Sequence, residues 1–159
     1  MAIISDDPEI RVAGQPDVPM LAELRWRMHI EEEDSQIGYE QFVTRFTAWA
    51  DRALVDERWR VWVAVTDLGI VGHVYLESVD KVPRPVERAG AWGYLTAFYV
   101  EEPFRNRGVG RRLLRAAIDE AISSGLEFVQ VWPSKRSVEL YERSGFVREG
   151  DALVLRLNS

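Results

Sequence analysis

Cysteine is missing from this sequence of 159 residues. Its absence excludes disulfide bonds, thiolate metal sites, iron–sulfur clusters and a cysteine nucleophile. The sequence also lacks any run of about 18 consecutive apolar residues, so we expect no membrane-spanning helix. Its first residues contain neither a basic segment nor a long apolar run, and they predict no secretory signal. Together these absences predict a cytoplasmic protein.

Histidine is also scarce, and the net charge is negative. Two histidines without any cysteine offer no metal-ligand spacing, so the sequence predicts no metal site. The 20 basic residues stand against 26 acidic ones, which gives a net charge of -6. Because a polyanion needs a basic face on its partner, nucleic acid is not an expected ligand.

The residues that are present suffice for one folded domain. With 47% hydrophobic and 29% charged residues, the composition is that of a globular protein, and we expect a single domain over residues 1–159. Hydrophobic periodicity predicts elements in the order βααβββαβαββ, which is a mixed α/β sheet. The expected strands cover 10–12, 59–65, 70–79, 92–100, 126–132, 146–147 and 152–157, and the expected helices cover 18–28, 39–54, 108–124 and 134–145.

A glycine-rich turn, Arg105-Asn106-Arg107-Gly108-Val109-Gly110, separates the strand that ends at Val100 from the next helix. In such a turn, backbone N–H groups meet an anion at the positive end of the helix dipole, and arginines add charge-assisted hydrogen bonds. No Gly-Lys-Ser/Thr follows, which excludes a Walker P-loop, and Leu113 stands where a dinucleotide fingerprint needs its third glycine. Coenzyme A is the remaining common ligand, and a tight turn without any ligand is the structural alternative.

Two blocks of sequence resemble the GCN5-related N-acetyltransferase (GNAT) family. Arg105-x-x-Gly108-x-Gly110 matches the family motif [Gln/Arg]-x-x-Gly-x-[Gly/Ala], with Phe98-Tyr99-Val100-x-x-Pro103 before it and Leu113-Leu114 after it. The second block, Trp132-Pro133-Ser134, Ser137 and Leu140 to Phe146, resembles the family's downstream motif. The resemblance extends over about residues 10–157. It implies the GNAT fold, an α/β fold with a mixed, mostly antiparallel central sheet flanked by helices.

The resemblance implies a coenzyme site residue by residue. The third long strand should splay from the strand at 126–132, so that acetyl-CoA binds in a V-shaped cleft between them. Phe98, Tyr99 and Val100 should accompany the pantetheine arm, with a strand amide near Tyr99 facing the thioester carbonyl. Ser134 or Ser137 should lie near the pantetheine or thiol end. The diphosphate should be held by the amides of Arg105, Asn106, Arg107, Gly108, Val109 and Gly110. The side chains of Arg105 and Arg111 should reach the phosphates or the adenosine 3′-phosphate.

The implied reaction is acetyl transfer from acetyl-CoA to a primary amine of a small molecule or peptide, by direct attack in a ternary complex. Tyr141 matches the family's tyrosine near the sulfur and is the expected general acid; a packed helix aromatic is the structural alternative. The amine must first lose a proton, because the ordinary pKa of a lysine-like amine is about 10.4. We expect Glu77 as the base, with His73, His29 and the acidic run 31–34 as alternatives.

The resemblance implies that the acceptor end of the cleft borders the acidic run 31–34, whose charges attract a cationic amine; a solvated loop is the structural alternative. Apolar lining for this end can come from tryptophans that otherwise belong to the core, namely Trp26, Trp49, Trp59, Trp62 and Trp92. The alternative function is a catalytically silent module that binds acyl-CoA for sensing or partner recruitment. The family resemblance also implies that two copies can pair as a homodimer.

Overall fold

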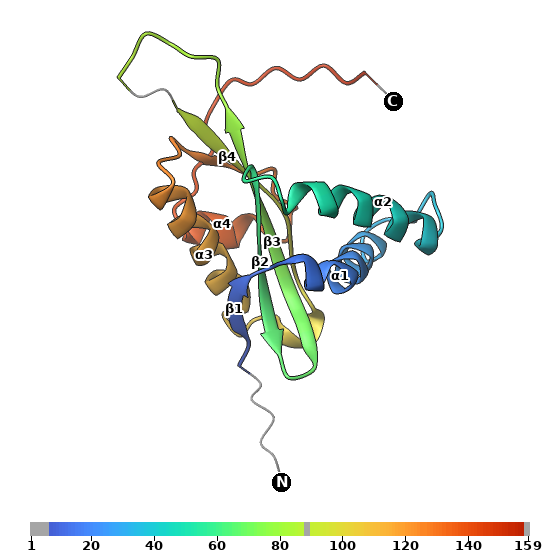
Figure 1. Cartoon of the computed structure of the whole chain (residues 1–159). Helices are drawn as coiled ribbons and strands as arrows, with labels where there is room; N and C mark the ends of the chain where they lie inside the picture. The colour runs from blue at the N-terminus through green and yellow to red at the C-terminus, as the bar shows by residue number, and fades with distance from the viewer. Residues whose placement is uncertain (1–6, 88–89, 158–159) are drawn as a thin grey trace.

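A five-stranded mixed sheet forms the centre of the computed structural model, which describes residues 7–87 and 90–157 (Figure 1). The strands follow one another across the sheet in chain order, and neighbours are antiparallel except for β4 and β5, which are parallel. Their bounds are β1 Glu9–Val12, β2 Trp59–Thr66, β3 Gly69–Asp80, β4 Ala91–Val100 and β5 Val129–Gln130. The expected α/β fold with a mostly antiparallel sheet is confirmed.

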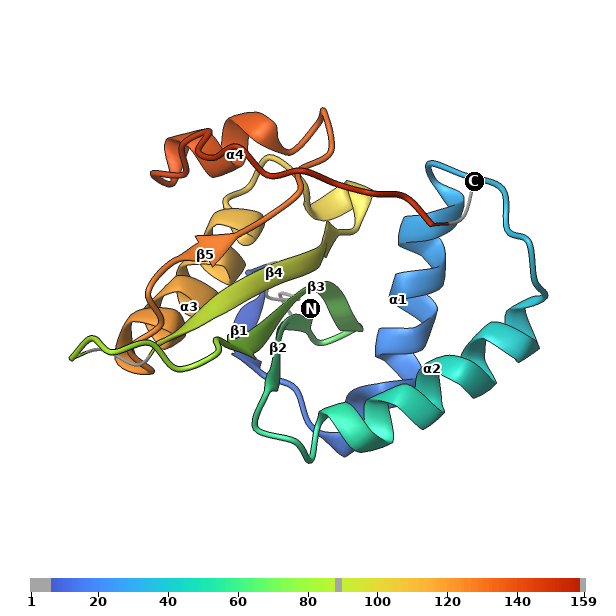
Figure 2. The same cartoon turned by 90° about the horizontal axis from the view of Figure 1, so that it is seen from above.

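Helices cover both faces of this sheet. Viewed from above, α1 and α2 lie on one side of the sheet and α3 and α4 on the other (Figure 2). The helices are α1 Val18–Ile30, α2 Tyr39–Ala53, α3 Val109–Ser123 and α4 Val138–Arg143, with short 3-10 turns at Gln15–Asp17 and Glu102–Phe104. Two separate hydrophobic cores result, one on each face of the sheet.

The alternation of side chains along the central strands explains the two cores. Successive side chains of a strand point to opposite faces. Trp62 and Ala64 of β2 accordingly pack with α3, whereas Val61 and Val63 pack with α1 and α2. On α3, apolar residues recur at helical spacing, and the fully buried Leu113 lies at the centre of that stripe. Both faces of the strands are therefore buried.

A bulge interrupts β4 at Ala97. The pairing between β3 and β4 shifts its register between His73 and Tyr75, and Ala97 takes a positive φ of 48°. The Nδ1 atom of the fully buried His73 lies 2.6 Å from the Ala97 carbonyl oxygen, so a neutral His73 donates its ring hydrogen to the bulge. This contact fixes the course of β4 towards its C-terminal end.

The structure corrects the expected order after α3. The strands expected at 146–147 and 152–157 do not form, and the described sheet ends at β5. Apolar residues give these segments strand propensity, but a strand also needs a neighbouring edge, and here the C-terminal segment extends away from the sheet (Figure 1). The strand expected over 126–132 is limited to Val129–Gln130.

The last helix is also shorter than expected. It begins at Val138, because residues 135–137 form a turn in which the Ser137 and Val138 N–H groups donate to the Ser134 carbonyl. Ser134 is therefore not the N-cap. At α1 the expected cap residue, Asp17, does precede the helix, but its carboxylate binds Arg11 and the Gly14 N–H.

Within residues 7–87 and 90–157, no helix is long and apolar enough to cross a membrane.

Candidate functional site

A cleft opens where β4 and β5 separate. Their pairing joins only Gly93 to Val129 and Tyr94 to Gln130, so the edge of β4 from Leu95 to Val100 has no strand partner in the described chain. The cavity has a volume of about 1080 Å³. Its lining comes from β4, the turn before α3, the segment 131–137, α4 and the end of α1. This volume is slightly above the range of about 300–1,000 Å³ for ligand sites and suits an extended ligand.

The glycine turn forms one end of this cleft. Gly108 precedes α3 with a φ of +81° and Asn106 has a φ of +60°, so the chain reaches the helix through two left-handed residues. An added Cβ at Gly110 would lie 2.9 Å from the Phe98 ring, so a glycine here lets α3 lie against β4. The first N–H groups of α3 have no partners within the helix and favour an anion.

Most residues expected at the diphosphate line this end of the cleft. Asn106, Gly108, Gly110 and Arg111 do so, as does Arg105. Arg111 makes no ion pair with any residue in the described part of the chain, so its charge is available to a ligand.

Two of the expected residues lie elsewhere. Val109 is buried in the core beneath the turn, and Arg107 lies over the Phe104 ring, outside the lining of the cleft.

The free edge of β4 presents backbone groups to the cleft. Glu101 donates its N–H to the Val71 carbonyl of β3, at 2.8 Å. The backbone groups of successive strand residues point to alternate sides of the strand. Those of Tyr99 therefore face β3, like those of Glu101, whereas those of Phe98 and Val100 face the cleft. Amides near Tyr99 that can meet a ligand are therefore those of its two neighbours. The Val100 carbonyl accepts a hydrogen bond of 2.7 Å from Arg105 Nε.

Tyr141 lines the cleft from α4. Its ring packs between Phe98 and Phe146, with centroid distances of 5.9 and 5.3 Å, and only 4% of its surface is exposed. Its hydroxyl forms no hydrogen bond with any described residue, yet it is not one of the fully buried unpaired atoms. Burial raises the pKa of Tyr141 above its ordinary value. Tyr141 is thus a packed helix aromatic whose hydroxyl stays protonated at the cleft.

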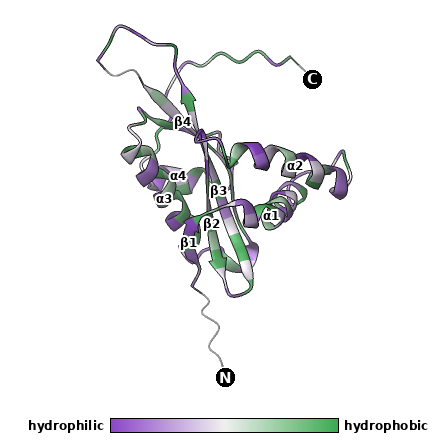
Figure 3. Ribbon diagram, in the orientation of Figure 1, coloured by the Kyte–Doolittle hydropathy of each residue, from purple (hydrophilic) through white to green (hydrophobic). Residues whose placement is uncertain are grey.

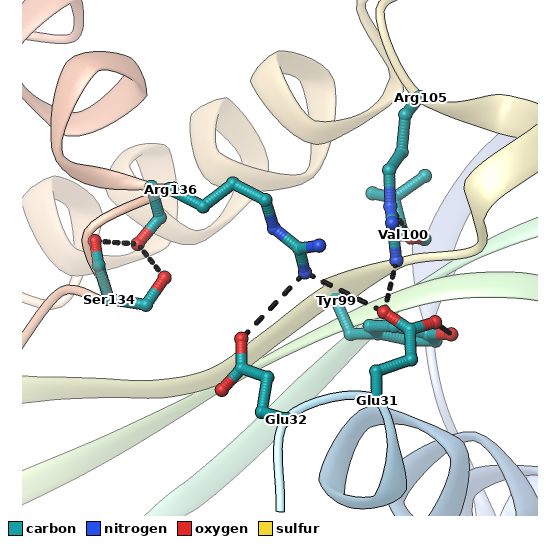
Figure 4. Close-up of polar contacts among 8 residues, drawn as sticks. Glu31, Glu32, Tyr99, Val100, Arg105, Ser134 and Arg136 are labelled. Atoms are coloured by element: carbon teal, nitrogen blue, oxygen red, sulfur yellow. Dashed lines mark hydrogen bonds and ion pairs between the residues drawn. The ribbon is translucent and has the colours of Figure 1, made fainter.

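A cluster around Glu31 joins the two walls of the cleft (Figure 4). Tyr99 Oη donates to one carboxylate oxygen of Glu31 at 2.5 Å, and Arg105 Nη2 donates to the other at 2.8 Å. Arg136 reaches over from the segment before α4, with its nitrogen 3.7 Å from Glu31 and 3.9 Å from Glu32.

The cluster shifts two pKa values. Burial alone would raise the pKa of Glu31, but the hydrogen bonds from Tyr99 and Arg105 lower it below its ordinary value. Burial, and then the bond to Glu31, raise the pKa of Tyr99. Glu31 is therefore a charged, fully engaged carboxylate that holds the end of α1 against β4.

The α1 side supplies the other lining residues of the cleft, Arg25, Met28 and Glu32. The Glu32 carboxylate has only the distant contact with Arg136, so it is the least engaged acid on this wall. A second cavity of about 430 Å³ lies between α1 and α2, with Trp26, His29, Glu33 and Asp34 in its lining. Arg25 lines both cavities, which places them side by side.

Ser134 and Ser137 both line the cleft, as expected, and their hydroxyls are 2.9 Å apart. Sequence reasoning missed Arg136 and Trp132, although both lie within or next to the second family block. It also missed Arg25 and Met28, because helical periodicity gives no sign that one turn of α1 faces a cleft.

Glu77 and His73 lie away from the cleft lining, as does His29, which lines the second cavity. Glu77 forms an ion pair of 2.8 Å with Arg58 and is opposite Tyr94 in the β3–β4 pairing. His73 is fully buried, and burial lowers its pKa to about 4.

The tryptophans expected at the acceptor end are dispersed. Trp49, Trp59 and Trp62 belong to the cores, Trp92 stacks on Phe128, and Trp26 lines the second cavity.

Comparison with known proteins adds an independent finding. A family model described as acetyltransferase (GNAT) family matches residues 18–146. No match is found among curated proteins. Among solved structures, a predicted acetyltransferase from Clostridium acetobutylicum, crystallised with acetyl-CoA, superposes with a TM-score of 0.83 at 23% identity, over 94% of this chain and 96% of its own.

Two further structures show the same fold. A GCN5-related N-acetyltransferase from Ralstonia eutropha has a TM-score of 0.78 at 21% identity, over 95% of this chain and 99% of its own. Glucosamine-6-phosphate N-acetyltransferase from Arabidopsis thaliana has a TM-score of 0.71 at 17% identity, over the same shares.

Proposed function

The chain belongs to the acetyltransferase (GNAT) family, and from that premise we propose that it transfers acetyl from acetyl-CoA to a primary amine of a small molecule or peptide. The observation that carries the proposal is the Tyr141 hydroxyl, protonated and without a partner among the described residues, in a cleft that ends at the glycine turn. In this proposal amine and coenzyme meet in one ternary complex, within a single cavity that is lined by α1 on one face of the sheet and by α4 on the other.

The cleft fits acetyl-CoA on three features of this chain. The open turn at Gly108 and the N-terminal N–H groups of α3 match a diphosphate, and Arg111 adds a cation. The unpaired edge of β4 at Phe98 and Val100 offers backbone donors and acceptors to the amide groups of the pantetheine arm. Ser134 and Ser137 add hydroxyls on the opposite wall.

Bound acetyl-CoA supplies the thioester: the amine nitrogen forms a bond to the acetyl carbon, and the carbon–sulfur bond breaks. Tyr141 Oη donates a proton to the departing sulfur, and the tyrosinate regains a proton, through water, from the nitrogen that becomes the amide. We assign no direct role to Glu77, because its carboxylate is held by Arg58 away from the lining of the cleft. Glu32, on the α1 wall, attracts the ammonium form and takes its proton, directly or through water.

Thiol release from acetyl-CoA tests this function. We expect a steady, amine-dependent release of CoA thiol when a panel of amino acids, polyamines, aminosugars and peptide N-termini is supplied, with acetylated products visible by mass spectrometry. The chain itself contributes no thiol to the assay, because it contains no cysteine.

The alternative function predicts a different result from the same assay. Calorimetric binding of acetyl-CoA, with no amine in the panel acetylated, would identify a silent acyl-CoA-binding module. Absence of acetyl-CoA binding would overturn both functions.

A further inference from the structure

Arg25 is a cation of the cleft without an anionic partner. It lies on α1, is half-buried, and lines the cavity beside β4. In the described part of the chain it forms no ion pair and no hydrogen bond, unlike its neighbour Arg27, which binds Glu23 and Glu101. Because a partly buried charge without a partner is costly, Arg25 is a candidate binding group for an anionic ligand.

The other arginines considered at the cleft have different partners or positions. Arg105 and Arg136 both bind Glu31. Arg111, like Arg25, has no ion pair in the described chain, but it lies at the glycine turn, where the diphosphate is expected. Arg25 and Arg111 are thus two available charges that belong to different parts of one cavity.

Arg25 lies beside the bulge of β4 and not at the glycine turn. It also lines the second cavity, between α1 and α2, and these helices are on the side of the sheet opposite α3 (Figure 2). Burial first, and the charge of Arg25 in addition, lower the pKa of His73. Burial raises the pKa of Tyr75, and the charge of Arg25 opposes that rise. Tyr75 is opposite Thr96, one residue before the bulge, whereas the turn follows the end of β4.

The negative charges of acetyl-CoA are all on its phosphates, and its acetyl end is neutral. With the diphosphate at the glycine turn, the 3′-phosphate lies still further from the thioester, because it is on the adenosine side of the molecule. The coenzyme therefore brings no anion to Arg25. An anion bound there must belong to the acceptor.

One face of α1 offers groups for an acceptor with two opposite charges. Arg25, Met28 and Glu32 all line the cleft and follow one another at the spacing i, i+3, i+7, which places them on one side of a helix. Both hydrophilic and hydrophobic colours appear along α1 in Figure 3. The row presents a guanidinium, a thioether and a carboxylate, and it therefore matches a molecule that carries an anion as well as an ammonium group.

A carboxylate fits this site better than a phosphate. A guanidinium binds a carboxylate through two parallel hydrogen bonds of matching geometry. A phosphate can carry a second negative charge, which needs a second cation. On the α1 wall of the described cleft Arg25 is the single cation, and the Glu32 carboxylate on the same wall repels additional negative charge.

On the basis of the proposed acetyl transfer, we propose that the acceptor amine also carries a carboxylate, and that Arg25 binds this carboxylate on the α1 side of the cleft. The substrate class is then the amino carboxylates, which include amino acids and short peptides with a free carboxyl end. Arg25 selects among amines, and Glu32 attracts the ammonium group at the other end of the row.

Acceptors that differ only in the carboxylate test the proposal. Thiol release from acetyl-CoA is measured with α-, β- and γ-amino acids, with the carboxamide of each, and with aminoethyl phosphate. We expect kcat/KM for the best amino acid to be at least about 10-fold higher than for its carboxamide. Equal values for the two, or a higher value for aminoethyl phosphate, would overturn the proposal.

Two substitutions on α1 assign the preference to one side chain. Arg25→Gln should lower kcat/KM for the amino acid at least about 10-fold and leave the value for its carboxamide nearly unchanged. Arg27→Gln is the matched control, because it removes the same charge from the same helix outside the lining of the cleft, and it should keep the preference. Equal losses for both acceptors in Arg25→Gln would show a merely structural role and would overturn the proposal.

Binding to the protein saturated with CoA gives a readout that needs no turnover. Calorimetry should show at least about 10-fold higher affinity for the amino acid than for its carboxamide, and Arg25→Gln should abolish the difference. Such a difference without acetylation of any amine would contradict the proposed acetyl transfer and support the Arg25 site. Acetylation of amines without any preference for the carboxylate would do the reverse, and failure of every amino acid to bind would overturn the site.

Discussion

Tyr141 is the residue whose chemical role is easiest to test with a single substitution. Tyr141→Phe keeps the ring packing with Phe98 and Phe146 and removes only the proton donor. We expect turnover to fall about 100-fold or more, with little change in the KM for acetyl-CoA. Steady-state kinetics on the best acceptor provide the measurement. An undiminished turnover would remove Tyr141 from the mechanism.

The buried His73 leads to a prediction about how the stability of the fold depends on pH. Burial lowers its pKa to about 4 from an ordinary value of 6.5, so between these limits the unfolded chain binds a proton that the folded chain excludes. Stability therefore falls as the pH falls from 6.5 towards 4, by at most about 1.4 kcal/mol per pH unit from this residue.

Urea unfolding at pH 7 and pH 5 measures that loss. His73→Gln keeps a hydrogen-bond donor for the Ala97 carbonyl and cannot titrate, so its loss of stability over this range should be smaller than in the wild type. Equal losses in the two proteins would contradict the assignment to His73.

The limits of sequence reasoning are visible in single residues. Gly108, Gly110 and Tyr141 could be placed at the cleft, because they belong to short sequence motifs whose spacing can be read directly from the chain. Glu77 could not, because its position on a strand does not reveal that Arg58, from the neighbouring turn, would hold its carboxylate.

Among the elements, α3 leads to a prediction about coenzyme binding at its N-terminus. Gly108→Glu adds bulk and negative charge at the open turn, and we expect the affinity for acetyl-CoA to fall at least 100-fold by calorimetry. Gly125→Glu is the matched control at the other end of α3: it also has a positive φ, +71°, and no neighbour within 4 Å. Both variants place a side chain at a positive φ, so equal affinities would argue against an anion site at the turn.

Elements stabilised by local periodicity were predictable, and those that depend on a distant partner were not. The apolar stripe of α3 gave its bounds to within a residue at each end. The strands expected at 126–132 and 152–157 have suitable residues, but their lengths depend on which edge lies beside them. At β5 only two residues meet β4, because the sheet opens there.

At the scale of the whole molecule, Glu31 ties together parts of the chain that are far apart in sequence. Arg105 and Arg136 approach the same carboxylate from opposite walls, but 23% of the Arg105 side chain is exposed against 59% for Arg136. Arg105→Gln should lower the free energy of unfolding by about 1–3 kcal/mol, because it leaves Glu31 and the Val100 carbonyl poorly paired. Arg136→Gln should cost less than about 1 kcal/mol.

Urea denaturation of the two variants beside the wild type checks this order. Comparable losses would contradict the prediction, because the ion pairs of Arg136 would then stabilise the fold as much as the hydrogen bonds of Arg105.

The gap in the sheet beyond Tyr94 makes β4 an indicator of whether the cleft is filled. The N–H groups of Phe98 and Val100 face that gap, so deuterium should replace their hydrogens quickly even in the folded protein. Tyr99 lies between them and pairs with His73, so its hydrogen should exchange slowly throughout. An alternating pattern of fast and slow sites that becomes uniformly slow when acetyl-CoA is added would record occupancy amide by amide.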